Sequence, residues 1–126
     1  MISGDDLELF GYYDMFPEKE ELTVADMYSN WVEEKILTYG DDRLVENTLG
    51  LVGEAGEVAE KIKKLIRDGN RYQAEEIMKE LGDVVFYATA LANIYGSGLQ
   101  EVLELNIDKL DSRQKRGKLH GSGDNR

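Results

Sequence analysis

The sequence contains no cysteine and only one histidine, His120, among its 126 residues. Without thiols the chain can form neither a disulfide framework nor a thiolate metal site. One histidine also cannot build the usual histidine-rich zinc sites or the Glu-x-x-His motifs of carboxylate-bridged di-iron bundles. His120 lies in a Gly- and Ser-rich C-terminal stretch, which is a poor setting for a catalytic triad. Carboxylate oxygens therefore remain as the main candidate metal ligands.

Basic residues are scarce as well. The chain has 15 Lys and Arg residues against 26 Asp and Glu residues, which gives a net charge of −11. This balance argues against binding of a nucleic acid polymer, because phosphate backbones need clustered Lys and Arg. It does not argue against a free nucleotide, because a divalent cation can bridge phosphates to carboxylates.

Long apolar runs are also absent. No stretch is long enough to span a bilayer, and the acidic N-terminus has no apolar segment typical of a signal peptide. We therefore expect a cytoplasmic protein that does not bind membranes. A chain of this length forms one domain, and it is small enough to depend on oligomerisation for part of its stability.

Hydrophobic spacing predicts an all-α fold with four helices and no strand. The first runs from Val24 to about Tyr39 with Thr23 and Asp26 as a capping box, and Gly40 stops it. The others run from a cap at Asp41 or Asp42 to about Asp68, from about Tyr72 to Tyr95, and from Leu99 to about Leu110 after a Ser97–Gln100 capping box. We expect an irregular arm at 1–22, a helical domain at 23–116 and a flexible tail at 117–126.

The third predicted helix is apolar on nearly every side between Val84 and Tyr95. A helix of this kind is buried on every side. Three other helices from so short a chain can hardly cover it, so the sequence predicts a subunit interface and at least a dimer.

Two acidic pairs stand out within apolar surroundings, at Glu54 and Glu57 and at Glu80 and Asp83. Each pair has a spacing of three residues, which places both side chains on one helical face about 5–6 Å apart at Cβ. Clustered carboxylates among apolar side chains repel one another and are poorly hydrated, so they need a neutralising partner. Mg²⁺ is the natural partner, because it prefers oxygen ligands and keeps several of its waters.

A short connection makes the second and third helices antiparallel neighbours. Counted from a turn near Asn70, the first pair lies about 15 residues back and the second about 11 forward, an offset of about 6 Å along the helix. An asymmetric turn or a slanted crossing could absorb this offset. Gly53, Gly56 and Gly82 lie beside the acids, where they either leave room for a ligand or allow close helix packing.

Two further charged residues share the acidic face. Lys61 can contact a phosphate, or it can pair with Glu57 four residues earlier. Glu76 can be an additional ligand, a group that orients the ligands, a general base or a solvated surface acid. Trp31 can stack on a base or pack in the core.

These motifs resemble those of a known family. The segments Gly50-Leu-Val-Gly-Glu-Ala-Gly-Glu-Val58 and Glu80-Leu-Gly-Asp-Val-Val-Phe-Tyr87 resemble the paired ExxE and ExxD signature of the MazG-type nucleoside triphosphate pyrophosphohydrolases. This all-α superfamily also includes dimeric dUTPases, dCTP pyrophosphatases and phosphoribosyl-ATP pyrophosphohydrolases. The segment from Asn106 to Arg113 is similar to the N-x-x-K-x-x-x-R stretch that closes the family core, although ordinary basic residues at a helix end would also account for it.

The resemblance implies a four-helix core of the MazG and dimeric dUTPase type, assembled as a homodimer or a dimer of dimers. It implies that Glu54, Glu57, Glu80 and Asp83 are catalytic residues that ligate Mg²⁺, with Mn²⁺ as a possible substitute. The substrate would be a nucleoside triphosphate, cleaved to the monophosphate and pyrophosphate. Phosphate or sugar would be held by residues of the fourth helix, namely Asn106, Lys109 and Arg113.

Two alternatives to this function remain open. One is a non-catalytic helical oligomer whose acids form a structural metal site. The other is a phosphoribosyl-ATP pyrophosphohydrolase, since no residue pattern in the sequence identifies the preferred base.

Overall fold

The computed structural model describes residues 21–69, 74–117, 120–121 and 123, and within them it contains helices and no strand. The predicted all-α fold is therefore confirmed. The helices are α3 (Val24–Lys35), α4 (Gly40–Asp68), α5 (Ala74–Ile94) and α6 (Leu99–Lys115). Most of the predicted arm and tail, the turn at Asn70 and the predicted helix start at Tyr72 lie outside the described residues. None of the described helices is both long and apolar enough to cross a membrane.

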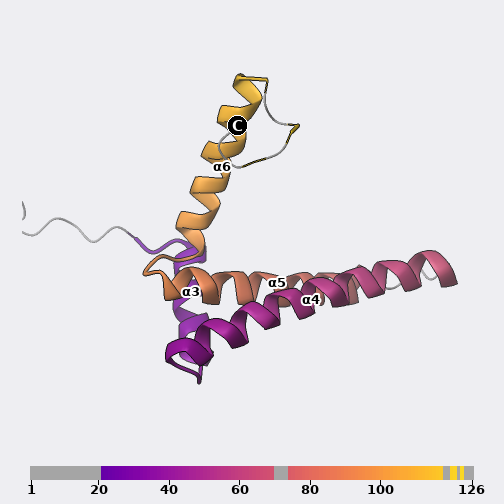
Figure 1. Ribbon diagram of the computed structural model, residues 1–126, viewed down its shortest axis with the longest axis horizontal. Coiled ribbons are helices and arrows are strands. Elements are labelled where there is room, and N and C mark those ends of the chain that lie inside the picture. Colours follow the sequence, from indigo (N-terminus) through magenta and orange to yellow (C-terminus); the bar gives the residue numbers. More distant parts are fainter. Residues whose placement is uncertain (1–20, 70–73, 118–119, 122, 124–126) are drawn as a thin grey trace, which may run out of the picture.

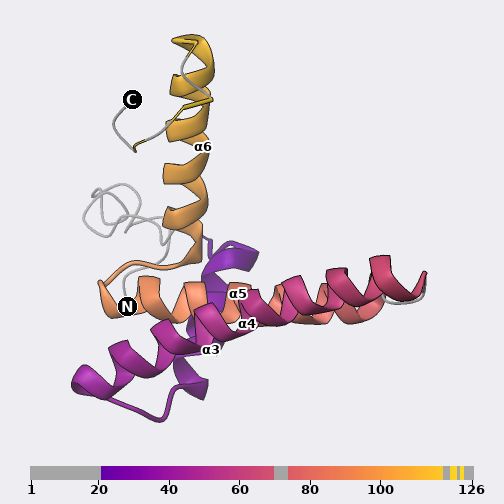
Figure 2. The ribbon, with the colours of Figure 1, turned by 45° about the vertical axis from the view of Figure 1, so that its right-hand side comes forward.

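Two long helices, α4 and α5, lie side by side along the length of the molecule (Figure 1). They run antiparallel, and α3 crosses them near the end opposite their connection (Figure 2). In both views α6 stands away from this pair, rising from the end of α5. It contacts α3 and α5 but not α4. The described helices are therefore arranged as an extended α4–α5 pair, crossed by α3, from which α6 projects.

The register of the α4–α5 pair is set by a close approach at Gly50. A Cβ atom built there would lie only 2.3 Å from Cε1 of Tyr87, so the Tyr87 ring packs directly on the α4 backbone. Further along, Lys61 of α4 pairs with Glu76 of α5. In both pairs the two residues are equally far along the chain from a point between Asp68 and Gly69. The hairpin is therefore centred at that point.

This register removes the offset that the sequence count suggested. Helix α4 ends at Asp68 as predicted, and Gly69 adopts the left-handed conformation, with φ 62°, that caps it. The register nevertheless centres the hairpin ahead of Asn70, the residue from which the sequence count started. With the centre moved back from Asn70, the two acidic pairs lie at equal distances from it. No slanted crossing is needed to bring them level.

The first helix begins as predicted and ends early. Thr23 accepts a hydrogen bond from the backbone of Asp26, whose side chain accepts one from Thr23 in return, so the capping box is confirmed. The helix ends at Lys35 rather than near Tyr39, because Ile36 adopts an extended conformation. From Ile36 to Tyr39, half-buried and exposed side chains alternate, which is typical of extended chain. Helix α4 then starts at Gly40 without a side-chain cap, so the predicted Asp41 or Asp42 cap is wrong.

The fourth helix begins at Leu99 as predicted, but its cap and its end differ from the prediction. Its N-cap is Gly98, without a side-chain hydrogen bond, and the Ser97 hydroxyl bonds instead to the Glu101 carboxylate. The predicted Ser97–Gln100 capping box is therefore wrong. The helix also continues to Lys115 rather than ending near Leu110, so Asn106, Lys109 and Arg113 all lie on it.

Ser29 fixes the point from which α6 projects. Its hydroxyl accepts a hydrogen bond from the backbone N–H of Leu99 at 2.8 Å, and its carbonyl accepts one from the Asn93 side chain at 3.0 Å. These bonds join α3 to both helices around the α5–α6 connection. Because Ser29 is itself buried, water competes poorly for them.

The single chain has very little apolar core. Among the described residues, Val32 and Ala90 are the buried apolar side chains, whereas Leu49, Val52 and Tyr95 are more than 60% exposed. The apolar face of α6 is also open, with Val102, Leu103, Leu105 and Ile107 exposed. Exposed apolar surface on this scale marks an interaction site. Most of this surface lies on α4 and α6, whereas residues 84–94 of α5 are buried or half-buried apart from Val85, so the single chain covers that stretch better than expected. The subunit interface remains a prediction.

The Gly50 contact generates a stability prediction. Gly-to-Ala changes inside a helix ordinarily stabilise it by about 1 kcal/mol. In Gly50→Ala the new methyl group would overlap the Tyr87 ring, and such overpacking costs about 1–3 kcal/mol. We expect a net decrease in the free energy of unfolding, measured by urea denaturation.

Gly53→Ala is the matched control on the same helix, because a Cβ atom there meets nothing within 4 Å among the described atoms. We expect it to be neutral or stabilising. Equal stabilities of the two variants would show that the Tyr87–Gly50 contact does not set the register.

Candidate functional site

Three of the four predicted carboxylates come together between α4 and α5. One oxygen from each of Glu54, Glu80 and Asp83 lies within 4.8 Å of the others, although they come from separate helices. Glu54 and Glu80 are half-buried, and Asp83 is exposed. The hairpin register places them together, because Glu54 faces the turn of α5 that carries the other two. We call these three residues the acidic cluster.

Glu57, the fourth predicted ligand, lies at the edge of this group. It is exposed and one turn from Glu54 on α4, and its oxygens fall outside the 4.8 Å set. Its charge nevertheless acts on Glu54. Its role as a ligand therefore stays a prediction.

The surroundings of Glu54 in the cluster raise the pKa of its carboxyl group. A hydrogen bond with Glu80 raises the pKa of Glu54 above its ordinary value, and partial burial raises it further. The charges of Asp83, Glu80 and Glu57 act in the same direction. A carboxyl group with a raised pKa holds its proton more tightly until a cation replaces it. The cluster is therefore electrostatically prepared for a cation.

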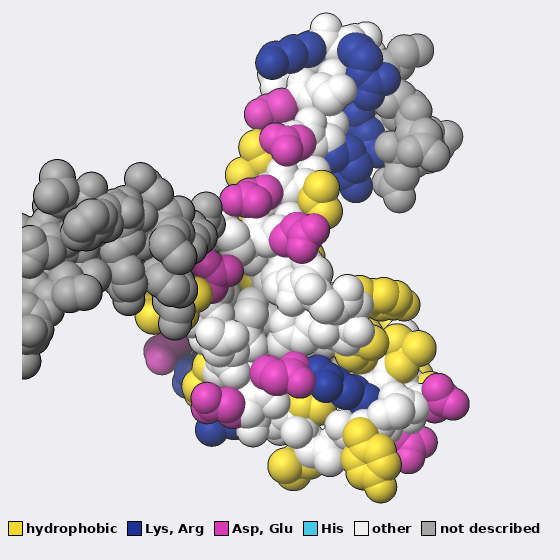
Figure 3. Space-filling view, turned by 90° about the vertical axis from the view of Figure 1, so that its left-hand side faces the viewer, with side chains coloured by type: hydrophobic (Ala, Val, Ile, Leu, Met, Phe, Trp, Pro, Cys, Tyr) yellow, Lys and Arg dark blue, Asp and Glu magenta, His cyan; other side chains and the backbone are white. Residues whose placement is uncertain are grey.

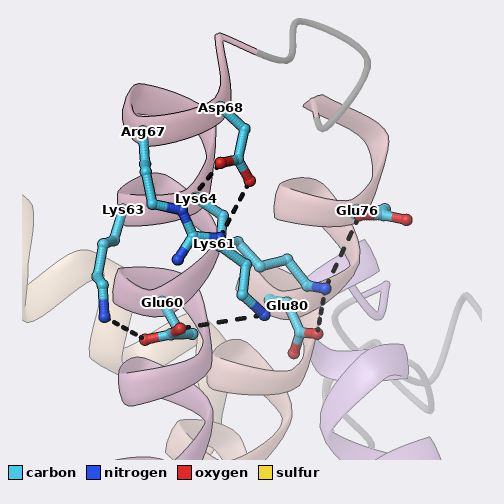
Figure 4. A network of polar contacts seen from close by, with 8 residues as sticks. All are labelled: Glu60, Lys61, Lys63, Lys64, Arg67, Asp68, Glu76 and Glu80. Carbon is cyan, nitrogen blue, oxygen red and sulfur yellow. Dashed lines mark hydrogen bonds and ion pairs between the residues drawn. The ribbon is translucent and has the colours of Figure 1, made fainter.

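Lys61 reaches across the hairpin to α5. Its Nζ lies 3.8 Å from an oxygen of Glu76 and 3.8 Å from an oxygen of Glu80, and Figure 4 shows it between the two helices. The structure thus pairs Lys61 with these acids rather than with Glu57. Glu76 is largely exposed at the outer end of this pairing. Both distances are long for direct hydrogen bonds, so the ammonium group can also face a phosphate at the cluster.

Four aromatic rings form a continuous row next to the cluster. The centroids of Tyr28 and Trp31 on α3 lie 5.6 Å apart. Trp31 meets Phe86 edge-on at 5.9 Å, and Phe86 meets Tyr87 at 5.3 Å. Trp31 is 47% exposed, so it contacts its two neighbours in this row without being enclosed in a core.

Tyr28 is a site residue that the sequence did not indicate. Burial raises the pKa of its hydroxyl, and the negative charge of Asp83 raises it further. This influence places Tyr28 near the cluster although it comes from α3. Its spacing of three residues from Trp31 indicates only a shared helical face, and no motif connects it with the acids.

The predicted substrate-binding residues of α6 lie away from the acidic cluster within one chain. Asn106, Lys109 and Arg113 lie on α6, and Figure 1 shows this helix projecting from the body. Basic side chains gather at the far end of this helix, and acidic ones line its stem (Figure 3). Since α6 makes no contact with α4, these residues do not meet Glu54 in the same chain.

Arg113 is enclosed at the end of α6. Only 4% of the residue is exposed, and its Nη2 donates a hydrogen bond to the carbonyl of Gly123 at 3.2 Å. In this conformation its guanidinium group is hydrogen-bonded to Gly123 of its own chain. A phosphate contact from Arg113 therefore requires that hydrogen bond to open.

The donor set of the acidic cluster fits a hard divalent cation. It offers only carboxylate oxygens, from side chains that repel one another, and Asp83 keeps one side open to solvent. Mg²⁺ binds through a few carboxylates, retains waters and adds substrate phosphates as ligands. Glu54, Glu80 and Asp83 would hold such an ion.

Comparison with known proteins agrees with these observations. The MazG nucleotide pyrophosphohydrolase domain matches residues 44–117, a range that covers most of α4 and all of α5 and α6. The chain is also 47% identical over 83 residues to the Gene 37 protein of Mycobacterium phage L5, which covers 63% of this chain and 73% of that protein. No solved structure gave a significant match. Because the matched domain spans more than half of the chain and contains both acidic pairs, the protein belongs to the MazG nucleotide pyrophosphohydrolase family.

Proposed function

We propose that this protein is a Mg²⁺-dependent nucleoside triphosphate pyrophosphohydrolase, which adds water across the bond between the α- and β-phosphates. The products are a nucleoside monophosphate and pyrophosphate. The observation that carries this proposal is the convergence of Glu54, Glu80 and Asp83 from two helices onto one point. Membership of the family supports the reaction class, and the oxygen-only donor set supports the choice of metal.

Each residue of the site has a separate proposed role. Glu54, Glu80 and Asp83 hold the cation and Glu57 completes the set, while Lys61 keeps Glu80 in position and meets a phosphate oxygen. When bound, Mg²⁺ supplies charge neutralisation for the phosphates and lowers the pKa of a coordinated water. The protein's task in this chemistry is to position the phosphates and balance their charge.

The basic end of α6 serves a second copy of the chain in this proposal. Lys109 and Arg113 cannot join the acidic cluster of their own chain, because α6 projects away from α4. The uncovered apolar faces of α4, α5 and α6 give a second copy a surface to pack on. In a homodimer or a dimer of dimers, the α6 of one copy would bring these residues and Asn106 to the phosphates held by the other.

The first test concerns the chemical step. In Asp83→Asn the cluster loses a charged ligand, and we expect the rate of pyrophosphate release from a nucleotide panel with Mg²⁺ to fall at least roughly 100-fold, the scale for losing one charge-stabilising group. Helix content measured by circular dichroism should not change. Glu75→Gln is the control, an exposed acid of the same helix that pairs with Lys79. An active Asp83→Asn enzyme would remove Asp83 from the metal site.

The second test concerns pH in the metal-free protein. The folded-state pKa of Glu54 is raised, so its contribution to the free energy of unfolding is greatest at low pH and is lost as pH rises through that pKa. We expect Glu54→Gln to gain stability relative to wild type as pH rises above about 4.3, the value for an unfolded Glu. Urea denaturation in chelator at several pH values measures this gain.

Two controls accompany that measurement. Mg²⁺ should restore wild-type stability at neutral pH, because it binds the ionised carboxylates and only the folded state assembles them. Glu34→Gln, an exposed acid on α3, should follow the wild-type pH dependence. Parallel pH profiles for Glu54→Gln and wild type would contradict a crowded cluster.

The third test asks whether α6 acts in the site of another copy. Asp83→Asn lacks the metal site, and a Lys109→Ala/Arg113→Ala double variant lacks the phosphate contacts. Mixed oligomers formed by refolding the two together contain sites with both parts intact only if α6 acts across the interface. We expect the mixture at low substrate to exceed the summed activity of the separate variants. Unchanged activity, or sedimentation of the wild type as a monomer at micromolar concentration, would contradict this arrangement.

A further inference from the structure

A cavity lies further along the hairpin from the acidic cluster. Its volume is about 260 Å³, far more than the roughly 30 Å³ share of one water molecule. It is lined by Lys35 at the end of α3, by the extended 36–38 connection, by Glu46 and Asn47 on α4, and by Phe86 and Tyr87 on α5. We call it the side cavity.

The side cavity continues the same helical faces that carry the acids. Tyr87 follows Asp83 by four residues, one turn or about 6 Å along α5. Asn47 precedes Glu54 by seven residues, two turns or about 10 Å along α4. A nucleotide with its reacting phosphates at the acidic cluster would therefore extend its sugar and base along the hairpin towards this cavity.

Two aromatic side chains of α5 that line the cavity suit a flat aromatic ligand. Phe86 and Tyr87 lie edge to face, with centroids 5.3 Å apart, and both line the space. The Tyr87 ring is held in place by its contact with Gly50. Fixed aromatic side chains bind nucleobases of any sequence by stacking.

Asn47 supplies the selective group. The residue is only 3% exposed, and its Nδ2 donates a 2.7 Å hydrogen bond to the Arg43 carbonyl. A carbonyl can only accept, so this bond fixes which end of the amide is nitrogen. The Oδ1 atom has no hydrogen-bond partner among the described residues, and it is not sealed from solvent. It therefore remains as an acceptor that a ligand can use.

We propose that the side cavity binds the base of the nucleotide substrate and that Asn47 selects bases with an exocyclic amino group, such as cytosine and adenine. The amino group would donate to Oδ1, and the neighbouring Glu46 carboxylate adds a second acceptor. Lys35 and Thr38 also line the cavity and can donate, but they come from α3 and the 36–38 connection rather than from α4 beside Asn47. A carbonyl at the same position, as in uracil or hypoxanthine, would face Oδ1 oxygen to oxygen. The inference rests on the proposed function for the position of the phosphates.

The test uses pairs of substrates that differ only in this group. We expect kcat/KM for dCTP to exceed that for dUTP, and for dATP to exceed that for dITP, by at least roughly tenfold, because the mismatched base leaves a buried acceptor unpaired. In Asn47→Ala both ratios should fall towards one. Thr48→Ala, a change of the exposed neighbouring residue, should keep the wild-type ratios.

The wild-type ratios need no variant, so a folding defect in Asn47→Ala leaves the test valid. Equal or inverted ratios in the wild type overturn the base assignment while leaving the pyrophosphohydrolase proposal intact. If no triphosphate is hydrolysed, the pyrophosphohydrolase proposal fails instead. Calorimetric titration with dCMP and dUMP then decides the base site alone, with tighter dCMP binding supporting it and equal or weaker binding rejecting it.

Discussion

The packing of the Tyr87 ring on Gly50 is the contact on which the site depends. With no side chain on α4 at this point, the two long helices approach closely enough for the ring to rest on the backbone. The contact fixes the register of the hairpin, and in an antiparallel pair the register decides which residues face each other. One turn further along, it brings Glu54 opposite Asp83 and Glu80. A slip in the register would separate the cluster without disturbing either helix.

The same register brings the carboxylates of the acidic cluster so close that they repel one another. Three carboxylates share one small volume, and Glu54 responds with a raised pKa. The Lys61 ammonium at 3.8 Å offsets only part of this charge. Folded proteins usually avoid such crowding, and a site that keeps it is arranged for a cation. In the proposed function, stability in the absence of metal is given up for an arrangement that would bind one.

The roles proposed here are divided between two parts of the molecule. The hairpin carries the acidic cluster and the side cavity on one continuous face, so metal and base would be placed by the same two helices. The projecting α6 carries the basic residues and is anchored by Ser29 at its base. With Val32 and Ala90 as its buried apolar side chains, the described chain has little to stabilise it alone. A second copy would both cover the apolar faces and complete the site.

Much of the fold, and the candidate residues of the site, could be predicted from the sequence. Hydrophobic spacing predicted four helices, Thr23 and Asp26 predicted the first cap, and the three-residue spacing of the acids placed each pair on one helical face. These features depend on residues close together in the chain, where helix geometry alone decides which side chains lie next to each other. The predictions that were wrong also have local causes, such as the early end of α3 at Ile36, where extended chain replaced a helix that the spacing allowed.

Contacts between elements were decided only by the tertiary structure. The sequence count left the acidic pairs offset, because the position of the turn was uncertain by a residue or two and each residue moves the register. The sequence offered Lys61 a phosphate or the local partner Glu57, yet in the structure it pairs across the hairpin with Glu76 and Glu80. Tyr28 and Asn47 carry no motif, and they gain their surroundings only when α3 and α5 pack around them. The sequence determined which groups are available, whereas the packing of the helices determined which of them share one site, because that depends on distances between residues far apart in the chain.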